Sequence, residues 1–572
     1  MKLKKTMVVV AVLTLSISTV LSACSSKKET SKEQASSSPA STPAATQAST
    51  PTPKPVIRMT ISLQQGSLYE GVQSDPVAKE IERRLGIQLD FKSMNEDQFK
   101  VLAASGDLPE IVLAQRKWLK VLVDGNKIIP LDDLVANAPN IKKQADRIKF
   151  SKQYLSENKG NLYALSAGGG PVAMQYMYDV GPNIRWDYYK ELGYPAMNNP
   201  DDFLNVMKQM QDKHPKTADG KKVYAFSLWN DWGTWPYKLY QTYGSGVEQM
   251  GTMEYNSDFA AKNFLMDESS SWWAGIKFYN KANQMGLLDP ESFVQKFDNM
   301  QAKGNNGQIL STYAAWTTQL NAELAKQGKD TAGFMPVPGM YPYVFHGGYS
   351  NNGNQDYLLV ITKNNKNPQR AMELLDFAFS EEGSRILWSG IEGEHWMKEG
   401  GVSKLKPDIV ANYDTANNAF VNLSGITKYQ KMAGFNAAKV HADGQRMDLA
   451  LAPEVFVKRS NPLDKDFSSH YNVVYPGQYY DKLVAEKKLK FLEINTDFQV
   501  ATGTVPDDIK RIDDNLMTFI STNVPKVIMA KTDAEFTTQM KSVIAEMVKM
   551  GLDQSNAYWT DVFTRTKASF KP

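Results

Sequence analysis

Residues 56–114 read VIRMTISLQQGSLYEGVQSDPVAKEIERRLGIQLDFKSMNEDQFKVLAASGDLPEIVLA, and this stretch decides the fold class. Three short apolar runs have the length and composition of β-strands: 56–63, 87–91 and 110–114. The segment after the first run begins a helix at Asp75-Pro76 and stops at Gly86, which are common start and stop signals. A second helical segment, 96–104, precedes the third run. Strands that alternate with helices predict a parallel α/β sheet.

Ligands of such sheets bind beyond the carboxyl ends of the strands. The first predicted strand is followed by Gln64-Gln65-Gly66 and the third by Gln115-Arg116. We therefore expect Gln65 and Arg116 to contribute to a ligand site.

The N-terminus has the order of a secretory signal, with lysines at its start and an apolar run from Met7 that continues in mixed form to Leu21. This predicts a signal peptide over residues 1–23. Leu-Ser-Ala-Cys at 21–24 resembles the lipobox of bacterial lipoproteins, which implies that Cys24 is lipidated and becomes the new N-terminus. Cys24 is the single cysteine of the chain. The alternative is an ordinary signal peptide with an incidental cysteine.

Residues 24–55 are rich in Ser, Thr, Ala, Pro and Lys and carry almost nothing apolar. Burial cannot offset chain entropy in such a segment, so we expect a disordered tether. The remainder of the chain is long enough for two or more domains.

The composition beyond the tether fits a soluble globular protein, with 42% hydrophobic and 22% charged residues in the whole chain. The formal charge is +3, and removal of residues 1–23 takes away three lysines and no acid. The neutral mature chain lacks the basic footprint of a nucleic-acid-binding protein, so no nucleic-acid partner is expected. With no second cysteine, its stability must come from core burial.

Several motifs occur in an order and spacing that resemble extracellular solute-binding proteins of ABC importers, above all the large oligosaccharide-binding lipoproteins of Gram-positive bacteria. They are GDLPEIV (106–112), IPLD (129–132), GPNIRWDYYKELG (181–193), KNPQRAMELLDFAFSEEG (366–383) and GIEGEHW (390–396). The resemblance implies a type II fold of two α/β lobes around an interlobe ligand cleft, with extra C-terminal helices. It places the first part of lobe 1 at 56–165, lobe 2 at 166–345, and the crossover with helices shared between the lobes at 346–572.

Residues 227–240, SLWNDWGTWPYKLY, are the most informative local feature. Trp229, Trp232 and Trp235 follow one another at intervals of three, and the glycine and proline between and after them disfavour a regular helix. Indole rings stack on the apolar faces of sugar rings, and Asn230 can hydrogen-bond to hydroxyl groups. We expect these residues to bind ligand; the alternative is that one or two of the tryptophans belong to the core.

Other candidate ligand-binding residues each have a structural alternative. Tyr313 and Trp316 follow a predicted strand, at the edge of the expected cleft. His346 and Tyr349 lie in a long glycine-rich segment, whose alternative is an ordinary hairpin or crossover loop. His395 and Trp396 would close one end of the cleft; the alternative is a structural turn with a buried tryptophan. Further candidates are Asn183 and Arg185, where the guanidinium suits a uronate carboxylate or, alternatively, a surface salt bridge.

No metal or cofactor is expected. Relatives carry a calcium loop where this chain has DKHPKTADGK (212–221), which holds lysines in place of oxygen ligands. The five histidines are scattered, with no close pair for zinc. No nucleophile elbow or phosphate loop occurs. A glycosidase needs only two carboxylates across a cleft, and Glu392 and Glu394 are candidates by position alone.

These observations favour a monomeric, lipid-anchored receptor on the extracellular face of the cell membrane, not an enzyme. It would capture oligosaccharides, plant-derived or uronate-containing, and deliver them to the permease subunits of an ABC transporter. The alternatives are a secreted carbohydrate-active enzyme and a surface carbohydrate sensor without transport.

Overall fold

The predicted strand–helix–strand pattern is confirmed in the computed structural model. Strand β1 (Ile57–Ser62) pairs in parallel with β3 (Ile87–Phe91). Helix α1 (Pro76–Leu85) connects them; the Asp75 carboxylate accepts a hydrogen bond from the N–H of Ala78, and Gly86 ends the helix at φ +63°, a left-handed conformation that suits glycine.

The structure describes residues 54–570 except for 64–68, 172–179, 315–316, 338–339, 355 and 414–417. From Lys54 onward the chain forms one compact unit. Among the helices in this described part, none is both long enough and apolar enough to cross a bilayer.

A six-stranded sheet with the order β2-β3-β1-β4-β13-β5 forms the first lobe. Its third parallel strand, β4 (Ile111–Ala114), pairs antiparallel with β13 (Leu358–Ile361), which arrives from much later in the chain. Alternate residues of β4 belong to different buried clusters, because successive side chains of a strand point to opposite faces. The sheet is therefore covered on both faces.

The elements of the first lobe, besides those above, are β2 (Gly71–Val72), α2 (Glu96–Ser105), α3 (Arg116–Asp124), α4 (Asp132–Val135), α5 (Pro139–Lys142), α6 (Ala145–Tyr154), β5 (Leu165–Ser166), α13 (Pro368–Ala378), α14 (Glu381–Ser389), β14 (Trp396–Glu399), β15 (Val402–Leu405), α15 (Pro407–Asn412), α16 (Asn418–Ser424) and α17 (Pro453–Arg459).

The second lobe is built on the sheet β10-β6-β11, whose strands are β10 (Ser311–Ala314), β6 (Val180–Arg185) and β11 (Phe334–Pro336). Parallel bridges, Tyr224 to Ile309 and Phe226 to Leu288, add two short extended segments that run in the same direction as β10. The largest buried cluster lies in this lobe, and residues from the chain's C-terminal helices complete it.

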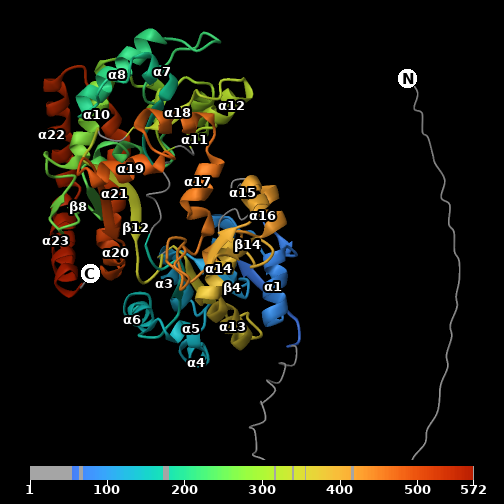
Figure 1. Ribbon diagram of the computed structural model, residues 1–572. Coiled ribbons are helices and arrows are strands. Elements are labelled where there is room, and N and C mark those ends of the chain that lie inside the picture. Colours follow the sequence, from blue (N-terminus) through green and yellow to red (C-terminus); the bar gives the residue numbers. More distant parts are fainter. Residues whose placement is uncertain are drawn as a thin grey trace, which may run out of the picture. The chain divides into compact units, whose positions relative to one another are not determined.

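The helices and remaining strands of this lobe are α7 (Trp186–Glu191), α8 (Pro200–Lys213), η2 (Trp235–Lys238), α9 (Gln241–Gly244), β7 (Val247–Met250), β8 (Met253–Asn256), β9 (Ala261–Asn263), α10 (Ser271–Gln284), α11 (Phe297–Asn305), α12 (Leu320–Lys326), α18 (Pro462–Tyr471), α19 (Gly477–Ala485), α21 (Asp507–Ile528), α22 (Asp533–Lys549) and α23 (Leu552–Ser569). Helix α21 packs on α10, α22 and α23, and Figure 1 shows these red C-terminal helices beside the green α10.

Two strands carry the chain from the second lobe to the first. Strand β12 (Tyr343–Tyr349) pairs in parallel with β16 (Lys490–Asn495). Beyond them, Ser350 bridges to Gly170, and the buried Asp497 carboxylate accepts hydrogen bonds from the Ser350 hydroxyl and from the N–H of Asn351. The two strand ends are therefore tied together where they reach the first lobe.

Candidate functional site

Three tryptophans gather at the carboxyl ends of the second-lobe strands. The ring centroids of Trp229 and Trp232 are 5.6 Å apart, those of Trp229 and Trp235 5.8 Å, and those of Trp232 and Trp235 5.5 Å. Phe297, at the start of α11, stacks on Trp232 at 4.6 Å. The segments that precede Trp229 and Tyr313 run in the same direction, so their ends meet at one edge.

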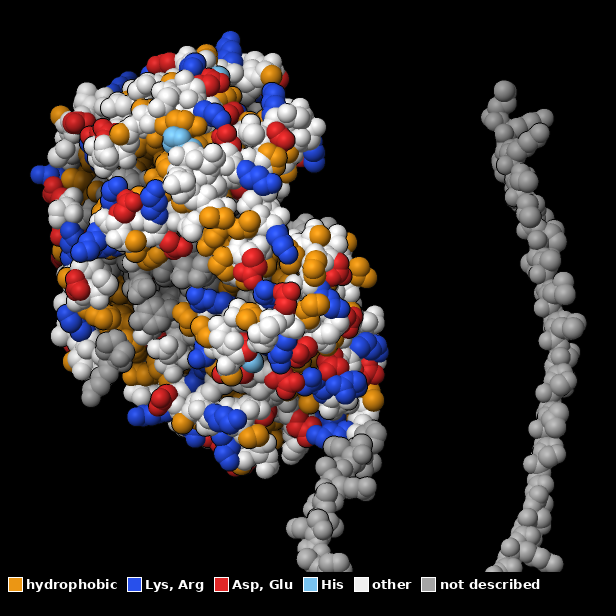
Figure 2. Space-filling view, viewed as in Figure 1, with side chains coloured by type: hydrophobic (Ala, Val, Ile, Leu, Met, Phe, Trp, Pro, Cys, Tyr) orange, Lys and Arg blue, Asp and Glu red, His pale blue; other side chains and the backbone are white. Residues whose placement is uncertain are grey.

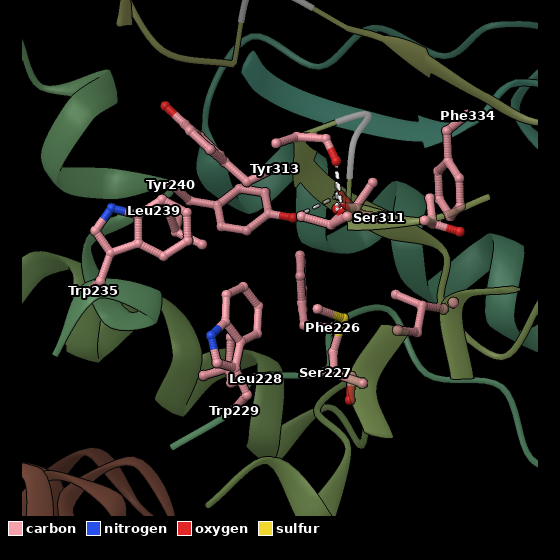
Figure 3. A pocket seen from close by; sticks show the side chains of 17 residues that line it. Phe226, Ser227, Leu228, Trp229, Trp235, Leu239, Tyr240, Ser311, Tyr313 and Phe334 are labelled. Carbon is pink, nitrogen blue, oxygen red and sulfur yellow. Dashed lines mark hydrogen bonds between the residues drawn. The ribbon is translucent and has the colours of Figure 1, made fainter. Parts of the chain in front are cut away.

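The three tryptophans differ in how much of each side chain is exposed to solvent. Trp229 is 3% exposed and belongs to the large core cluster, whereas Trp232 is 41% exposed. The indole N–H of Trp229 is buried without a hydrogen-bond partner. Figure 3 shows Trp229, Trp235, Tyr240 and Tyr313 around one small cavity.

This cavity has a volume of only about 30 Å³, which is the space of about one water molecule. The Tyr240 hydroxyl is 2.9 Å from the Ser311 hydroxyl at its side. A sugar ring does not fit inside, so ligand in this conformation would contact the outer rings of the cluster. Asn230 is exposed and donates from its amide to the carbonyl of Phe293 at 3.3 Å.

Two charged side chains beside this cluster, Lys238 and Glu248, belong to no recognisable sequence motif. Lys238 ends the short helix η2 that begins with Trp235, and Glu248 lies on β7. Burial lowers the pKa of Lys238 and raises the pKa of Glu248, while their mutual attraction partly opposes both shifts. Both side chains are partly exposed, so they are enclosed but reachable.

The first lobe offers a larger and more polar pocket of about 440 Å³. It opens at the edge where β4, β5 and β13 meet, and Tyr357 and Trp388 supply its rings. The pocket places one basic and one acidic side chain, Lys431 and Asp356, and burial lowers the pKa of Lys431 and raises the pKa of Asp356. The remaining lining residues are Gly168, Gly170, Ser350, Asn354, Gln430, Asn436 and Thr496.

A third cavity of about 510 Å³ lies on the second lobe, between α7, α18 and α19. Tyr194 stacks on His470 and Tyr471 stacks on Tyr479, each pair with centroids 3.7 Å apart. No motif in the sequence indicates a role for these four residues. On the face that Figure 2 shows, basic and acidic side chains are intermixed.

Arg116 lies at the end of β4, as predicted, but its guanidinium group binds backbone carbonyls of this chain. It donates to the carbonyls of Gln499, Val500 and Gly503 at 3.2, 3.0 and 3.0 Å. These carbonyls lie in and just after the short helix α20 (Asp497–Ala501), so Arg116 binds α20 to the first lobe. Gln65, the partner expected at the neighbouring strand end, lies outside the described residues.

Asn183 and Arg185 are buried in β6 and line none of the three cavities described above. The Asn183 amide donates to the carbonyl of Gly181 at 2.8 Å. Arg185 forms an ion pair with Asp187 at 2.6 Å, and its guanidinium lies 3.9 Å from the ring centre of Tyr188. This is the salt-bridge alternative, in a buried setting.

His395 and Trp396 form a buried turn of the first lobe. His395 Nδ1 accepts a hydrogen bond from the N–H of Ile391 at 2.9 Å, and the Trp396 indole donates to the carbonyl of Gly390 at 2.9 Å. Burial also lowers the pKa of His395. These contacts are those of the structural alternative.

Besides Gln65, three more of the predicted ligand-binding side chains are not described. Trp316 lies outside the described residues, and His346 and Tyr349 belong to β12, of which the structure describes the strand but not these side chains. Cys24 also lies outside the described part.

Within the described residues, no group of three or more His, Cys, Asp or Glu side chains is placed to hold a metal ion. In the loop at 212–221, Asp212 pairs with Lys208, and Asp219 pairs with Lys221 at 3.1 Å. Ammonium groups therefore neutralise the carboxylates of this loop.

Comparison with known proteins places the chain among binding proteins. The family model of the bacterial extracellular solute-binding protein matches residues 74–385. The fructooligosaccharide ABC transporter substrate-binding protein FusA of Streptococcus pneumoniae serotype 4 is 24% identical over 323 residues, which are 53% of this chain and 57% of that protein. The match thus spans little more than half the length of this relative.

Solved structures show the same two-lobed fold across most of the chain. Pneumococcal FusA in complex with kestose has a TM-score of 0.59 at 16% identity and covers 90% of this chain and all of that one. The alginate-binding protein AlgQ2 without calcium ion has a TM-score of 0.58 at 19% identity, covering 90% of this chain and 99% of that one. An HMO-binding solute-binding protein from Bifidobacterium longum infantis has a TM-score of 0.59 at 13% identity, covering 89% and 98%. The two-lobed fold predicted from the sequence is thus confirmed, and the chain belongs to the bacterial extracellular solute-binding proteins.

Proposed function

We propose that this protein captures oligosaccharides outside the cell and delivers them to the permease of an ABC importer. The observation that carries the proposal is the set of aromatic rings at the carboxyl edge of the second lobe. Trp232 and Trp235 supply the outer rings there, and Tyr357 and Trp388 supply rings at the corresponding edge of the first lobe. Ring faces with a few polar groups between them suit saccharides.

The relatives support this class of ligand. One is named for fructooligosaccharides, one for alginate and one for HMO. All three are saccharide ligands, although they differ in charge. We extend to this chain only what these ligands share, a chain of sugar rings.

Capture would require the lobes to close about the crossing strands, with ligand favouring the closed state. Helix α20 is placed to couple the lobes during this motion. Its Phe498 packs in a cluster with Met250 and Trp559 of the second lobe, whereas Val500 packs in a cluster of the first lobe. Because α20 packs against both lobes, it restricts how the lobes can move relative to each other during closure.

We propose that Cys24 carries the lipid that holds the protein at the outer face of the membrane, with residues 24–55 as the tether. Two or three acyl chains give stable anchoring. In cells, Cys24→Ser should move the protein from the membrane fraction to the medium. Retention of this variant in the membrane fraction would contradict the anchor.

We also propose that the protein acts as a monomer and does not alter its ligand. The Glu392 and Glu394 side chains are exposed on a turn of the first lobe, and Glu392 pairs with Lys398 at 3.6 Å, so this pair gives no support to a glycosidase site.

The test is a binding screen with the purified mature chain. Kestose, nystose, an alginate tetrasaccharide and a milk-type oligosaccharide are tested by thermal shift, because a bound ligand raises the melting temperature by mass action. Positive ligands are then titrated by calorimetry, and the sugar is recovered and analysed by chromatography. Saturable binding with intact sugar supports the proposal; a cleaved sugar, or no binding across the panel, contradicts it.

A further inference from the structure

The β7–β8 hairpin and η2 bring Lys238, Glu248 and Gln249 together. The Lys238 ammonium donates to the Gln249 side-chain oxygen at 3.3 Å. Gly246, just before the hairpin, packs on the ring of Tyr343, where a Cβ atom would approach a ring carbon to 2.7 Å. This contact fixes the hairpin against the crossing strand β12, where the second lobe leads to the first.

These three side chains have unused hydrogen-bonding capacity. The Glu248 carboxylate accepts one hydrogen bond, from the N–H of Gln249 at 2.8 Å. Lys238 and Glu248 attract each other, but they form no ion pair within 4.0 Å. The Gln249 amide nitrogen is buried without an acceptor. Polar groups are costly to leave unsatisfied in such a setting, and the partly exposed Lys238 and Glu248 side chains can accept an external polar partner.

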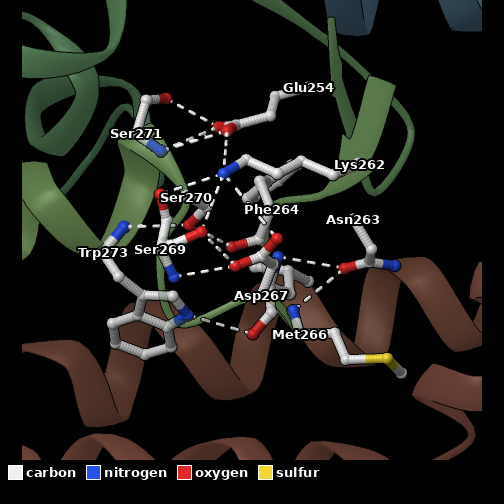
Figure 4. Close-up of polar contacts among 11 residues, drawn as sticks. Glu254, Lys262, Asn263, Phe264, Met266, Asp267, Ser269, Ser270, Ser271 and Trp273 are labelled. Carbon is white, nitrogen blue, oxygen red and sulfur yellow. Dashed lines mark hydrogen bonds and ion pairs between the residues drawn. The ribbon is translucent and has the colours of Figure 1, made fainter. Parts of the chain in front are cut away.

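The neighbouring carboxylate on the same hairpin shows the contrast. Glu254 lies directly across from Gln249 and is buried. It accepts hydrogen bonds from the N–H and the hydroxyl of Ser271, at 3.0 and 2.6 Å, and has the Lys262 ammonium at 3.8 Å (Figure 4). Glu254 therefore stabilises the start of α10, and residues of this chain satisfy the hydrogen bonds of its carboxylate.

The position of the group connects it to the aromatic cluster. Trp235 and Lys238 are three residues apart on a 3₁₀ helix, a spacing that places them on one face. On the other side, the Gln499 amide of α20 donates to the carbonyl of Gln249 at 3.4 Å and to the Tyr255 hydroxyl at 3.3 Å. The group thus lies between the tryptophans and the helix that couples the lobes.

We propose that Lys238 and Glu248 bind adjacent hydroxyl groups of a neutral saccharide, with Lys238 donating to one oxygen and Glu248 accepting from another. This deepens the proposed function and rests on it. A ligand of net charge gains from one of these side chains and loses to the other, because their charges are opposite. A vicinal diol satisfies both at once, and it is present in nearly every sugar ring.

The experiment compares Glu248→Gln and Lys238→Met with the matched controls Glu254→Gln and Lys262→Met. Each variant is checked for a cooperative melt and titrated calorimetrically with kestose, nystose and an alginate tetrasaccharide. Hydrogen bonds to charged groups predict a loss of about 10- to 100-fold in affinity for the neutral sugar in the two test variants. The controls should keep their affinity within about threefold, even where Glu254→Gln lowers the melting temperature.

The outcomes separate this inference from the proposed function. Equal affinity of the test variants and the wild type for a neutral sugar overturns the inference and leaves the function standing. A wild type that prefers the acidic alginate probe also overturns the inference alone. A wild type that binds no member of the panel contradicts the function and the inference together.

Discussion

The carboxyl edges of the two lobes differ in how much space their side chains leave for a ligand. In the second lobe, Trp229, Trp235 and Tyr313 pack so closely that their cavity is about 30 Å³. In the first lobe, Tyr357 and Trp388 leave a pocket of about 440 Å³. One edge is therefore a closely packed aromatic wall, whereas the other has room for a sugar ring among amide and charged side chains.

The largest expected effect is a loss of stability at Trp229, which we assign to the closely packed rings of the second lobe. Trp229→Ala removes a ring that is 3% exposed from the main core cluster. Loss of a buried tryptophan costs about 3–5 kcal/mol of unfolding free energy. Denaturant unfolding measures the change. A loss below about 1 kcal/mol would show that Trp229 is not structural.

The second effect concerns the exposed side of the wall. Trp232→Ala combined with Trp235→Ala should weaken oligosaccharide binding by about 1000-fold, because two aromatic anchors at ~2 kcal/mol each contribute ~4 kcal/mol together. Calorimetry measures the affinity, and Trp118→Ala, on a helix of the first lobe where Trp118 packs on Phe99, is the matched control. An affinity within twofold of the wild type would remove the tryptophans from the site.

The third effect tests the first-lobe pocket. Lys431→Met keeps most of the side-chain volume but removes an ammonium group that lies 5.7 Å from the ring centre of Tyr357. We expect about a tenfold loss of affinity, the value of one hydrogen bond to a charged group. Lys439→Met, beside the same lobe's Phe435, is the control. If both variants bind like the wild type, only the second lobe carries the affinity.

The last prediction concerns the smallest effect on binding, because it changes stability and leaves the affinity for sugar unaltered. Burial raises the pKa of Asp448 to about 6. A carboxyl group with a raised pKa in the folded state stabilises the fold below its unfolded pKa, and this contribution is lost as the pH rises through 6. Asp448→Asn should therefore gain stability relative to the wild type between pH 4 and pH 6.5, by on the order of 2 kcal/mol.

Unfolding curves across that pH range measure the difference, and the affinity for sugar at pH 7 should not change, since Asp448 lines neither pocket. A stability difference that is flat with pH would show that Asp448 stays ionised throughout.

The local parts of the fold were predictable because their signals are local. The strands at 57–62, 87–91 and 111–114 follow from short apolar runs, and the end of α1 follows from Gly86. The addition of β13 to the same sheet was not predictable, because its partner β4 lies more than 240 residues earlier in the chain. No periodicity reports pairing over that distance.

The same distinction explains the site. The three tryptophans lie within seven residues, so their proximity was visible in the sequence, but the burial of Trp229 depends on the core around it. Tyr357, Trp388 and Lys431 come from separate segments, and only the folded lobe brings them to one pocket. Nothing in the sequence distinguishes Lys238 and Glu248 from surface charges, because their burial depends on the folded hairpin.

The most direct test is a crystal structure of the mature chain with a bound oligosaccharide from the binding screen. Our account predicts sugar rings against Trp232 and Trp235, with hydroxyl groups at Lys238 and Glu248 and the first-lobe pocket on the opposite side of the ligand. A sugar that is seated instead in the tyrosine-lined cavity of Tyr194 and Tyr471, with the tryptophans untouched, would contradict it.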